Sequence, residues 1–368
     1  MAYKVVAVCG DPGGAASLAP VIEILASEPE WEVEVFAYFS GLGLLRARGL
    51  SCEELPPDPS TQAARTLLET RSAGILLTAT SSNGWNWEHF FTLAARDLGI
   101  RSVALLDFWS NYARRFSDSA GDLRYLPDRI AVMDQYALKE MAEEGFPTQM
   151  LEITGQPAFD CLAQARAQFD RQKRQQIRSA YGVAPDGWLV VFASQPLREV
   201  YGSESAPLGY DERHVLDLLI VALENIQSQT QRAITLVVRP HPREKHIQAV
   251  SQALNVRVVA EGGAAEWAMS ADLVAGMNSV LLLEACLLGC AVVSLQPGLL
   301  LPDCLPSNAW GASQAVYDAC AIEPTVRALL ENAQTRENLV SKTQGLAERL
   351  PEHAARNVVD LLRSEISV

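Results

Sequence analysis

Short apolar runs of strand length alternate with segments of helical pattern along this 368-residue chain, and this alternation limits the possible folds more than any other feature. It is typical of parallel βαβ units. The first half predicts strands at Val5–Cys9, Val33–Ala37, Ile75–Thr78, Ser102–Leu106, Ile130–Met133 and Leu151–Thr154. The second half predicts strands at Trp188–Ala193, Ile234–Val238, Val256–Val259, Leu273–Ala275 and Ala291–Leu295. The predicted fold class is therefore α/β, with two Rossmann-like domains built on parallel sheets.

The length fits two domains, at roughly 150 residues for each. We predict a Rossmann-like, acceptor-side domain at 1–163, a linker helix at 164–185, a second Rossmann-like domain at 186–350, and a terminal helix at 351–368 that packs back on the first domain. The basic stretch Gln164–Arg178 is interpreted as a solvated helix, and a peripheral membrane contact through it stays open as the alternative. The segment Asn111–Pro127 is interpreted as a long loop.

The composition narrows the possible partners. Thirty basic and 44 acidic side chains give a formal charge of -14, which argues against a nucleic-acid partner. No apolar run reaches the roughly 18–20 residues that span a bilayer, so we expect a cytoplasmic protein without a transmembrane segment. Seven cysteines without a Cys-x-x-Cys pair fit neither a disulfide framework nor a structural zinc site. The sequence does not indicate the oligomeric state.

The loop after the first predicted strand is a candidate site, because ligands of open parallel sheets bind beyond the carboxyl ends of strands. It reads Gly10-Asp11-Pro12-Gly13-Gly14 and matches neither a nicotinamide-binding fingerprint nor a P-loop. Gly13 and Gly14 allow a sugar to approach the backbone closely. Asp11 is either a helix cap or a catalytic base.

Two further strand ends of the first half carry side chains that suit a sugar. The segment after the predicted strand Ile75–Thr78 has hydroxyl, amide, indole and carboxylate groups. Its candidate sugar-binding residues are Ser81, Asn83, Trp85 and Glu88. The second places Asp107 and Trp109 directly after a strand. The alternative interpretation is a pair of polar turns with the tryptophans packed underneath.

The second half offers a cationic strand exit at Arg239-Pro240-His241-Pro242-Arg243. The two prolines stiffen this exit and hold His241 where it can contact a phosphate, while Arg239 and Arg243 supply charge-assisted donors. We therefore expect these three side chains to bind the donor nucleotide.

A predicted helix start follows the strand that ends at Ala275. Gly276, Asn278 and Ser279 lie there, and the backbone N–H groups of such a helix start can bind an anion. Glu284 lies inside the same helix and would bind a ribose if it faces the ligand. Helix capping is the alternative role for Asn278 and Ser279, and the two roles are compatible.

These segments resemble the GT-B superfamily of nucleotide-sugar enzymes over nearly the whole chain. The run Arg239-Pro240-His241-Pro242 is similar to a motif of bacterial capsule sialyltransferases and CDP-glycerol glycerophosphotransferases. Ser279 followed by Glu284-Ala285 and Gly289 resembles the superfamily's donor-binding pattern. Thr154-Gly155-Gln156-Pro157 with Asp160 resembles a segment of Kdo transferases and UDP-N-acetylglucosamine 2-epimerases. The resemblance implies two Rossmann-like domains whose parallel sheets face a central cleft, and it does not select one family.

The departures from those families bear on the activity. Hydrolysing 2-epimerases carry Arg-Pro-Glu after the first strand and His-Arg-x-Glu-Asn in the second domain, and this chain does not. Asp107, however, sits where that family places a catalytic acid. Kdo transferases bear a glutamate in the first loop, where this chain has Asp11.

The first hypothesis is a metal-independent glycosyltransferase of bacterial glycan or polysaccharide biosynthesis, with a nucleotide-sugar donor, an unknown acceptor and no cofactor. Asp11 or Asp107 would be the base, Arg239, His241 and Ser279 would stabilise the leaving nucleotide, and Glu284 would bind ribose. The alternatives are a nucleotide-sugar 2-epimerase-like isomerase that uses Asp107 with Glu88, and a non-catalytic nucleotide-sugar-binding protein. The sequence leaves the nucleotide base, the sugar, the acceptor and the stereochemistry open.

Overall fold

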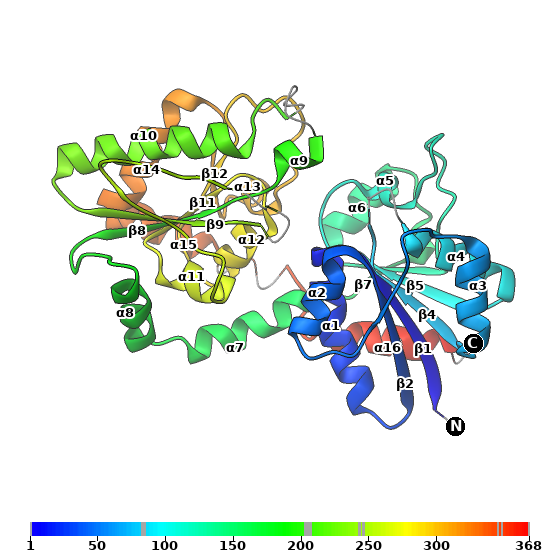
Figure 1. Ribbon diagram of the computed structural model, residues 1–368. Helices are drawn as coiled ribbons and strands as arrows, with labels where there is room; N and C mark the ends of the chain where they lie inside the picture. Colours follow the sequence, from blue (N-terminus) through cyan, green and yellow to red (C-terminus); the bar gives the residue numbers. More distant parts are fainter. Residues whose placement is uncertain are drawn as a thin grey trace. The chain divides into compact units, whose positions relative to one another are not determined.

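The computed structural model describes residues 2–81, 86–201, 208–241, 244, 247–343, 346 and 349–366. The chain forms two compact units, shown in Figure 1. The first unit comprises Met1–Asp160 and Arg349–Val368, and the second comprises Cys161–Glu348. Within the described residues, each helix is too short or too polar to cross a membrane.

The first unit contains a seven-stranded parallel sheet with the strand order β3-β2-β1-β4-β5-β6-β7. Its strands are β1 (Tyr3–Cys9), β2 (Trp31–Ala37), β3 (Glu53–Glu54), β4 (Ile75–Thr78), β5 (Arg101–Leu105), β6 (Arg129–Val132) and β7 (Leu151–Ile153). The six predicted strands are confirmed with ends that differ by at most two residues. The edge strand β3 was not predicted, because its two exposed glutamates give no apolar run.

Helices cover both faces of this sheet. They are α1 (Pro12–Ser27), α2 (Phe39–Ala47), α3 (Thr61–Thr70), α4 (Trp87–Leu98), α5 (Tyr112–Phe116), α6 (Gln135–Glu143) and α16 (Ala354–Ile366), with single 3-10 turns at Thr148–Met150 and Pro157–Phe159. Alternate residues of β1 face opposite sides, so Ala7 packs in a core with α1 and α16 while Val8 packs with α3 and α4. The helix α5 corrects the prediction that Asn111–Pro127 is only a loop.

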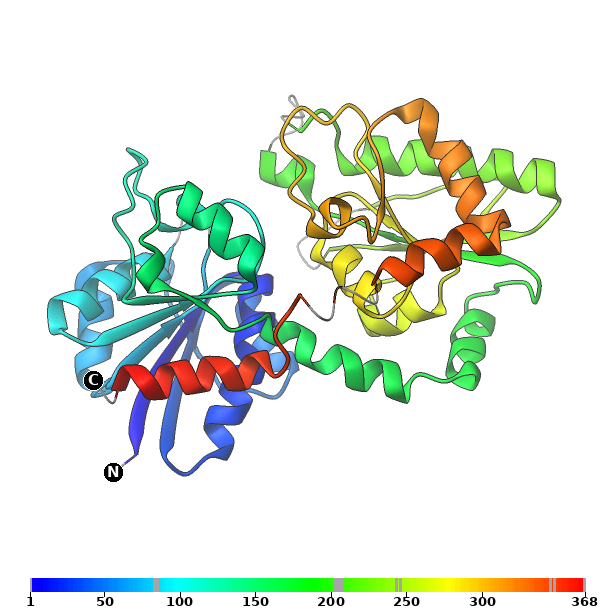
Figure 2. The same ribbon diagram turned by 180° about the vertical axis from the view of Figure 1, so that it is seen from behind.

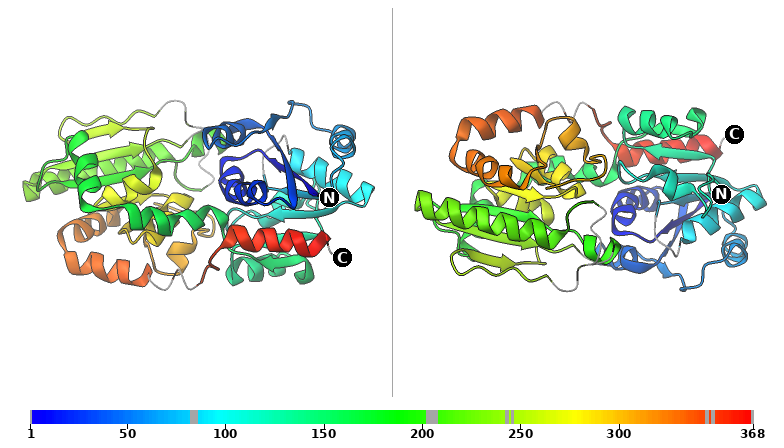
Figure 3. Two further views of the ribbon diagram at one scale, coloured as in Figure 1. Left: turned by 90° about the horizontal axis from the view of Figure 1, so that it is seen from below. Right: turned by 90° about the horizontal axis from the view of Figure 1, so that it is seen from above.

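Helix α16 joins the first unit through the segment that follows β7. The Asp160 carboxylate accepts hydrogen bonds from the backbone N–H groups of Ala354 (2.9 Å) and Ala355 (2.8 Å), which caps the helix start. Gly155 has a φ of +94°, and a Cβ atom there would lie 2.8 Å from the Pro351 carbonyl oxygen. Figures 2 and 3 show α16 lying along the first unit, where it packs against α1.

The second unit contains a six-stranded parallel sheet with the order β10-β9-β8-β11-β12-β13. Its strands are β8 (Trp188–Ala193), β9 (Ile234–Arg239), β10 (Asn255–Val258), β11 (Leu273–Gly276), β12 (Val292–Leu295) and β13 (Gln314–Val316). The five predicted strands are confirmed. Strand β13 was missed because it is three residues long and only Val316 is fully buried.

The helices of this unit begin with α7 (Asp160–Gln168), which starts at the boundary of the first unit. The others are α8 (Arg171–Ala180), α9 (Leu197–Tyr201), α10 (Glu212–Thr230), α11 (Ala264–Ser270), α12 (Val280–Leu287), α13 (Pro306–Ala309), α14 (Ile322–Glu331) and α15 (Ala333–Thr343), with a 3-10 turn at Ala319–Ala321. The predicted single basic helix at Gln164–Arg178 is two helices, because the Asp170 side chain caps the start of α8. Arg174 and Arg178 also pair with Asp272 instead of facing only solvent.

Candidate active site

The strand order of each sheet reverses at one point, and both sets of predicted site residues lie near these points. In the first sheet the reversal falls between β1 and β4, and in the second between β8 and β11. Helices on the two sides of a reversal leave a crevice at the carboxyl edge, where open α/β sheets bind ligands. A ligand is therefore expected at the loops after β1, β4 and β5 and at those after β8, β9 and β11.

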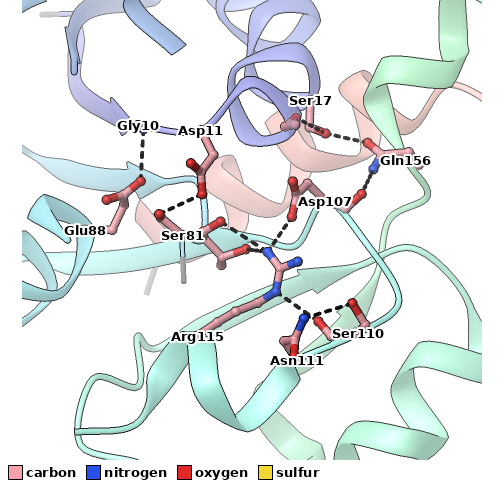
Figure 4. A network of polar contacts seen from close by, with 12 residues as sticks. Gly10, Asp11, Ser17, Ser81, Glu88, Asp107, Ser110, Asn111, Arg115 and Gln156 are labelled. Carbon is pink, nitrogen blue, oxygen red and sulfur yellow. Dashed lines mark hydrogen bonds and ion pairs between the residues drawn. The ribbon is translucent and has the colours of Figure 1, made fainter. Parts of the chain in front are cut away.

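Asp11 follows β1 at the start of α1, and its carboxylate does not cap that helix through a hydrogen bond. Its Oδ2 atom instead accepts a hydrogen bond of 2.7 Å from the Ser81 hydroxyl, which belongs to the loop after β4 (Figure 4). The side chains of two neighbouring strand ends thus meet. The half-buried Asp11 carboxylate therefore does not make the cap hydrogen bond that the capping interpretation expects.

Glu88 lies in the first turn of α4 and is buried beneath the loop after β1. Its carboxylate accepts a hydrogen bond of 3.1 Å from the backbone N–H of Gly10, and it also accepts one from the Tyr38 hydroxyl. Burial without an opposite charge raises the pKa of Glu88 to about 8, although the hydrogen bond from Tyr38 opposes this. At 3% exposure, Glu88 supports the loop from below and does not itself offer a surface to a sugar.

Asp107 follows β5 and forms a nearly buried ion pair with Arg115 of α5. The guanidinium donates to the Asp107 carboxylate at 2.5 Å, and also to the Thr80 hydroxyl at 2.8 Å. The second carboxylate oxygen lies so close to Gly13 that a Cβ atom there would be 2.2 Å away. A Cβ atom at position 13 would therefore force this carboxylate to move from its place beside the start of α1.

Gln156 connects this edge to the segment that docks α16. Its side-chain amide donates to the Asp107 backbone carbonyl at 2.6 Å, and its amide oxygen accepts from the Ser17 hydroxyl at 2.8 Å. Gln156 is buried, so the two contacts fix the chain after β5 against α1. Gly14, which was expected to contact a sugar, lies buried in α1.

Trp109 packs in the core of the first unit. It is 2% exposed, and its indole N–H donates to the Asp134 carboxylate at 2.9 Å. Its ring is therefore shielded from solvent in this structure, and the expected contact of Trp109 with a sugar stays a prediction. Asn83 and Trp85, the other residues selected for a sugar, lie outside the described residues.

In the second unit, Asn278 and Ser279 lie at the start of α12, directly after β11. The Asn278 backbone N–H donates at 3.0 Å to the side chain of Gln195, which follows β8. The Ser279 hydroxyl accepts from the Leu281 backbone N–H at 3.3 Å, so it caps the helix. In the described part of the chain, the buried Oδ1 atom of Asn278 has no hydrogen-bond partner. Gly276 is buried at the end of β11, and Glu284 is half-buried on α12.

The exit from β9 is held by Glu244. The Glu244 carboxylate accepts from the His241 backbone N–H at 2.7 Å and from the Ser194 hydroxyl at 2.8 Å, and burial raises its pKa. His241 is half-buried at this exit. A cavity of about 560 Å³ opens beside Glu244, and its described lining, from α9 and α10 among others, includes none of the predicted donor-binding residues.

Arg239 makes contacts that the sequence did not predict. Its guanidinium donates to the backbone carbonyls of Val259, Glu261 and Gly262. These bonds tie the end of β9 to the chain after β10, so part of its donor capacity is already used. Its predicted role toward a phosphate stays a prediction, and Arg243 lies outside the described residues.

Sequence reasoning overlooked several residues that build these edges. No role was assigned from the sequence to Tyr38, Thr80, Arg115, Gln195 or Glu244. Gln156 belongs to the segment Thr154-Gly155-Gln156-Pro157, whose resemblance to known families was the one signal for it in the sequence. The contacts of the other residues depend on which strand ends are neighbours in the sheet, and local sequence patterns do not contain this information.

A scan of protein-family models and a search of curated proteins both give no match. Solved structures do match. The S. aureus MnaA–UDP co-structure has a TM-score of 0.74 at 12% identity, over 99% of this chain and 97% of that one. The UDP-GlcNAc 2-epimerase from Neisseria meningitidis bound to UDP-GlcNAc has a TM-score of 0.67 at 14% identity, over 98% and 100%. Anabaena HepE in complex with UDP has a TM-score of 0.66 at 14% identity, over 99% and 100%.

These likenesses establish the fold. Two α/β units with parallel sheets, matched over nearly the full length of both chains, give this chain the GT-B fold. The fold expected from the sequence is therefore confirmed.

Proposed function

We propose that this chain is an enzyme that acts on a nucleotide sugar, and that its reaction is of the 2-epimerase type. The proposal departs from the first hypothesis drawn from the sequence and adopts its alternative. Support comes from the matched structures, because several of those that it resembles over their full length are UDP-GlcNAc 2-epimerases. One of them is bound to UDP-GlcNAc.

The observation that carries the proposal is the placement of Asp107. A 2-epimerase inverts the configuration at C2 of the sugar. The C–H bond at C2 must therefore break on one face of the ring and form again on the other. A base and an acid must therefore act at that carbon. The Arg115 guanidinium fixes the Asp107 carboxylate in one orientation beside the start of α1, as a proton-transferring group needs. We assign Asp107 to one of these two roles.

Glu88, which the epimerase alternative pairs with Asp107, has a different role in this proposal. Its pKa of about 8 keeps it protonated at neutral pH, and the Tyr38 hydroxyl contacts it directly. Since Glu88 is buried, we assign it a positioning role: it holds the Gly10 loop, and through that loop the start of α1, in place. In the second unit, the start of α12 and the exit from β9 are the proposed nucleotide-binding elements, with His241, Asn278 and Ser279 as contacts.

A glycosyltransferase is the second candidate, and Asp11 favours it. The Asp11 carboxylate is half-buried, oriented by Ser81 and not used as a cap, so it could accept the proton of an acceptor hydroxyl. No metal is assigned to either reaction, and the expectation of metal independence stays a prediction.

One incubation separates these functions. The protein is mixed with UDP-GlcNAc in deuterated water and the products are followed by NMR and mass spectrometry. An epimerase incorporates deuterium at C2 and forms the C2 epimer. A glycosyltransferase releases UDP and moves the sugar to an added acceptor without deuterium at C2. Binding without any turnover would favour the non-catalytic alternative, and no binding by any of a panel of nucleotide sugars would contradict the proposal.

A further inference from the structure

A cavity of about 620 Å³ lies in the second unit, at the edge of the sheet where the parallel strands begin. Its lining includes Asp272 and Ala291, which directly precede β11 and β12. The proposed nucleotide contacts Asn278 and Ser279 follow the opposite end of β11. At about 3.3 Å per residue, the four residues of β11 set the two places roughly 13 Å apart. The cavity is therefore separate from the proposed nucleotide site.

Three guanidinium groups from three different helices line this cavity. They belong to Arg166 of α7, Arg174 of α8 and Arg336 of α15. Within the described residues, Arg166 forms no hydrogen bond and no ion pair. Its head group lies against the turn between α12 and β12, where a Cβ atom on Gly289 would be 3.3 Å away. In Arg336, Nη1 donates to two backbone carbonyls in the last turn of α14, while Nε and Nη2 have no partner in the part of the chain that the structure describes. Both arginines can therefore donate to a ligand.

The charge around the cavity is positive, although the chain carries a formal charge of -14. Asp272 pairs with Arg174 at 2.8 Å, and at 2.9 Å with Arg178, which is not part of the described lining. Glu337 is the other carboxylate of the described lining. Together with the two remaining guanidiniums of the lining, four positive groups face two negative ones. The local field therefore attracts an anion.

The thiol of Cys290, which also lines the cavity, indicates where two of these cations lie. Burial raises the pKa of Cys290 to about 12, and the charges of Arg166 and Arg174 oppose this rise. The head groups of α7 and α8 therefore approach the same part of the wall. Such an arrangement suits the oxygens of one phosphate group, each of which can accept from a different guanidinium.

Much of the remaining lining is apolar. Phe169, Met269 and Val340 are half-buried there, and Leu288 is buried. Inorganic phosphate would leave these side chains uncovered, whereas an organic phosphate can place an apolar body against them. Phe169 carries the one aromatic ring of the described lining, and such a ring packs well against a flat heterocycle.

We propose that this cavity binds an organic phosphate, with the phosphate group on Arg166, Arg174 and Arg336 and the apolar body against Phe169. A guanidinium donates in a planar fork that matches the oxygens of a phosphate. The volume of about 620 Å³ falls within the roughly 300–1,000 Å³ of small-molecule sites. A nucleoside monophosphate combines the two required parts. The proposal does not depend on the reaction proposed above.

The test measures binding to the full chain by calorimetry, with UMP, AMP, glucose 6-phosphate and inorganic phosphate as probes. Arg166→Ser removes a guanidinium that holds no other described residue, so the fold should persist. Phe169→Leu keeps an apolar side chain but removes the ring. The matched control is Arg257→Ser, which removes the same charge from an exposed position of the edge strand β10. His241→Ala reports binding of the same probes at the proposed nucleotide site.

We expect a nucleoside monophosphate to bind, and Arg166→Ser to weaken this binding about 10-fold. Phe169→Leu should weaken it about 2- to 10-fold and leave glucose 6-phosphate and inorganic phosphate unaffected. Added salt should weaken the binding as well. Arg257→Ser and His241→Ala should leave it unchanged. If UMP occupies both places, its titration has two steps, and only one of them should depend on Arg166.

Four outcomes overturn the proposal. The first is that the wild-type protein binds none of the four probes. The second is that Arg166→Ser leaves the affinity unchanged, or that Arg257→Ser weakens it equally, which would indicate a general attraction to positive charge. The third is that His241→Ala alone abolishes binding, which would place the probe at the nucleotide site. The fourth is that inorganic phosphate binds as tightly as every organic probe. None of these outcomes bears on the epimerase reaction, which deuterium incorporation tests separately.

Discussion

The Asp107 carboxylate and the Arg115 guanidinium lie 2.5 Å apart, and both side chains are shielded from solvent, with 11% and 9% exposure. The pair joins the end of β5 to α5, and Arg115 extends it to the Thr80 hydroxyl after β4. An ion pair so deeply placed holds its partners in one orientation, and removing either charge leaves the other unpaired.

The two candidate reactions predict different effects of Asp11→Asn and Asp107→Asn. An epimerase should lose most turnover with Asp107→Asn and little with Asp11→Asn. A glycosyltransferase that uses Asp11 as its base should lose turnover with Asp11→Asn and keep nearly the same nucleotide affinity, since that interaction forms mainly in the transition state. Product formation and calorimetric UDP binding check this. Equal activity of both variants and the wild-type protein would exclude both assignments.

Arg115→Met should destabilise the first unit, because it leaves the Asp107 carboxylate buried and unpaired. We expect a loss of about 3–5 kcal/mol in the free energy of unfolding. The double variant Asp107→Asn, Arg115→Met should recover much of this loss, since neither charge remains. Urea unfolding of the wild-type protein and of the two variants measures the difference. A double variant as unstable as Arg115→Met would show that Arg115 acts by packing alone.

The buried Glu88 carboxyl group should make stability depend on pH. Its pKa is raised from 4.5 to about 8, so the folded protein binds this proton more tightly than the unfolded chain does. The contribution of protonated Glu88 to the stability of the folded protein is fully present below pH 4.5. It is lost as the pH rises through about 8. Glu88→Gln keeps a carbonyl oxygen for the Gly10 N–H and cannot ionise. The thermal midpoint of the wild-type protein, relative to Glu88→Gln, should therefore fall across this range, and parallel pH profiles would contradict the prediction.

His241→Ala should weaken nucleotide binding at least several-fold, if the exit from β9 contacts the phosphate. The backbone N–H of residue 241 that donates to Glu244 is kept in this variant, so the local turn should persist. Calorimetry with UDP measures the effect, with the exposed helix residue His214→Ala as the control. Unchanged affinity in His241→Ala would remove this histidine from the proposed nucleotide site.

Asp160→Ala should loosen α16, because two backbone N–H groups at its start lose their acceptor. A lost helix cap costs about 1 kcal/mol. Hydrogen exchange should accelerate in 354–366 more than in α1, against which α16 packs. Asp160→Asn, which keeps a carbonyl oxygen, should have the smaller effect. Uniform exchange across the first unit in Asp160→Ala would mean that the helix does not depend on this cap.

Much of the fold could be predicted from the sequence, because buried parallel strands are continuous apolar runs such as Val5–Cys9 and Trp188–Ala193. Strands without such a run, such as Glu53–Glu54, could not. At the site, local spacing indicated that Asp11, Ser81 and Asp107 follow strands, since each comes directly after an apolar run. Their partners could not be inferred in this way. The contacts of Arg115 with Thr80, of Gln195 with Asn278 and of Tyr38 with Glu88 depend on which strands are neighbours, and no local pattern records this.

The docking of α16 on Asp160 has a consequence for how the protein is made. The first unit lacks this helix until the ribosome has synthesised all of Cys161–Glu348. At about 5–20 residues per second, that interval lasts roughly 10–40 s. During it, the face of the first sheet that Val358 and Leu362 later cover remains open, while the second unit, which is continuous in sequence, can already fold. We therefore expect the nascent first unit to depend on chaperones more than the second, although it emerges earlier.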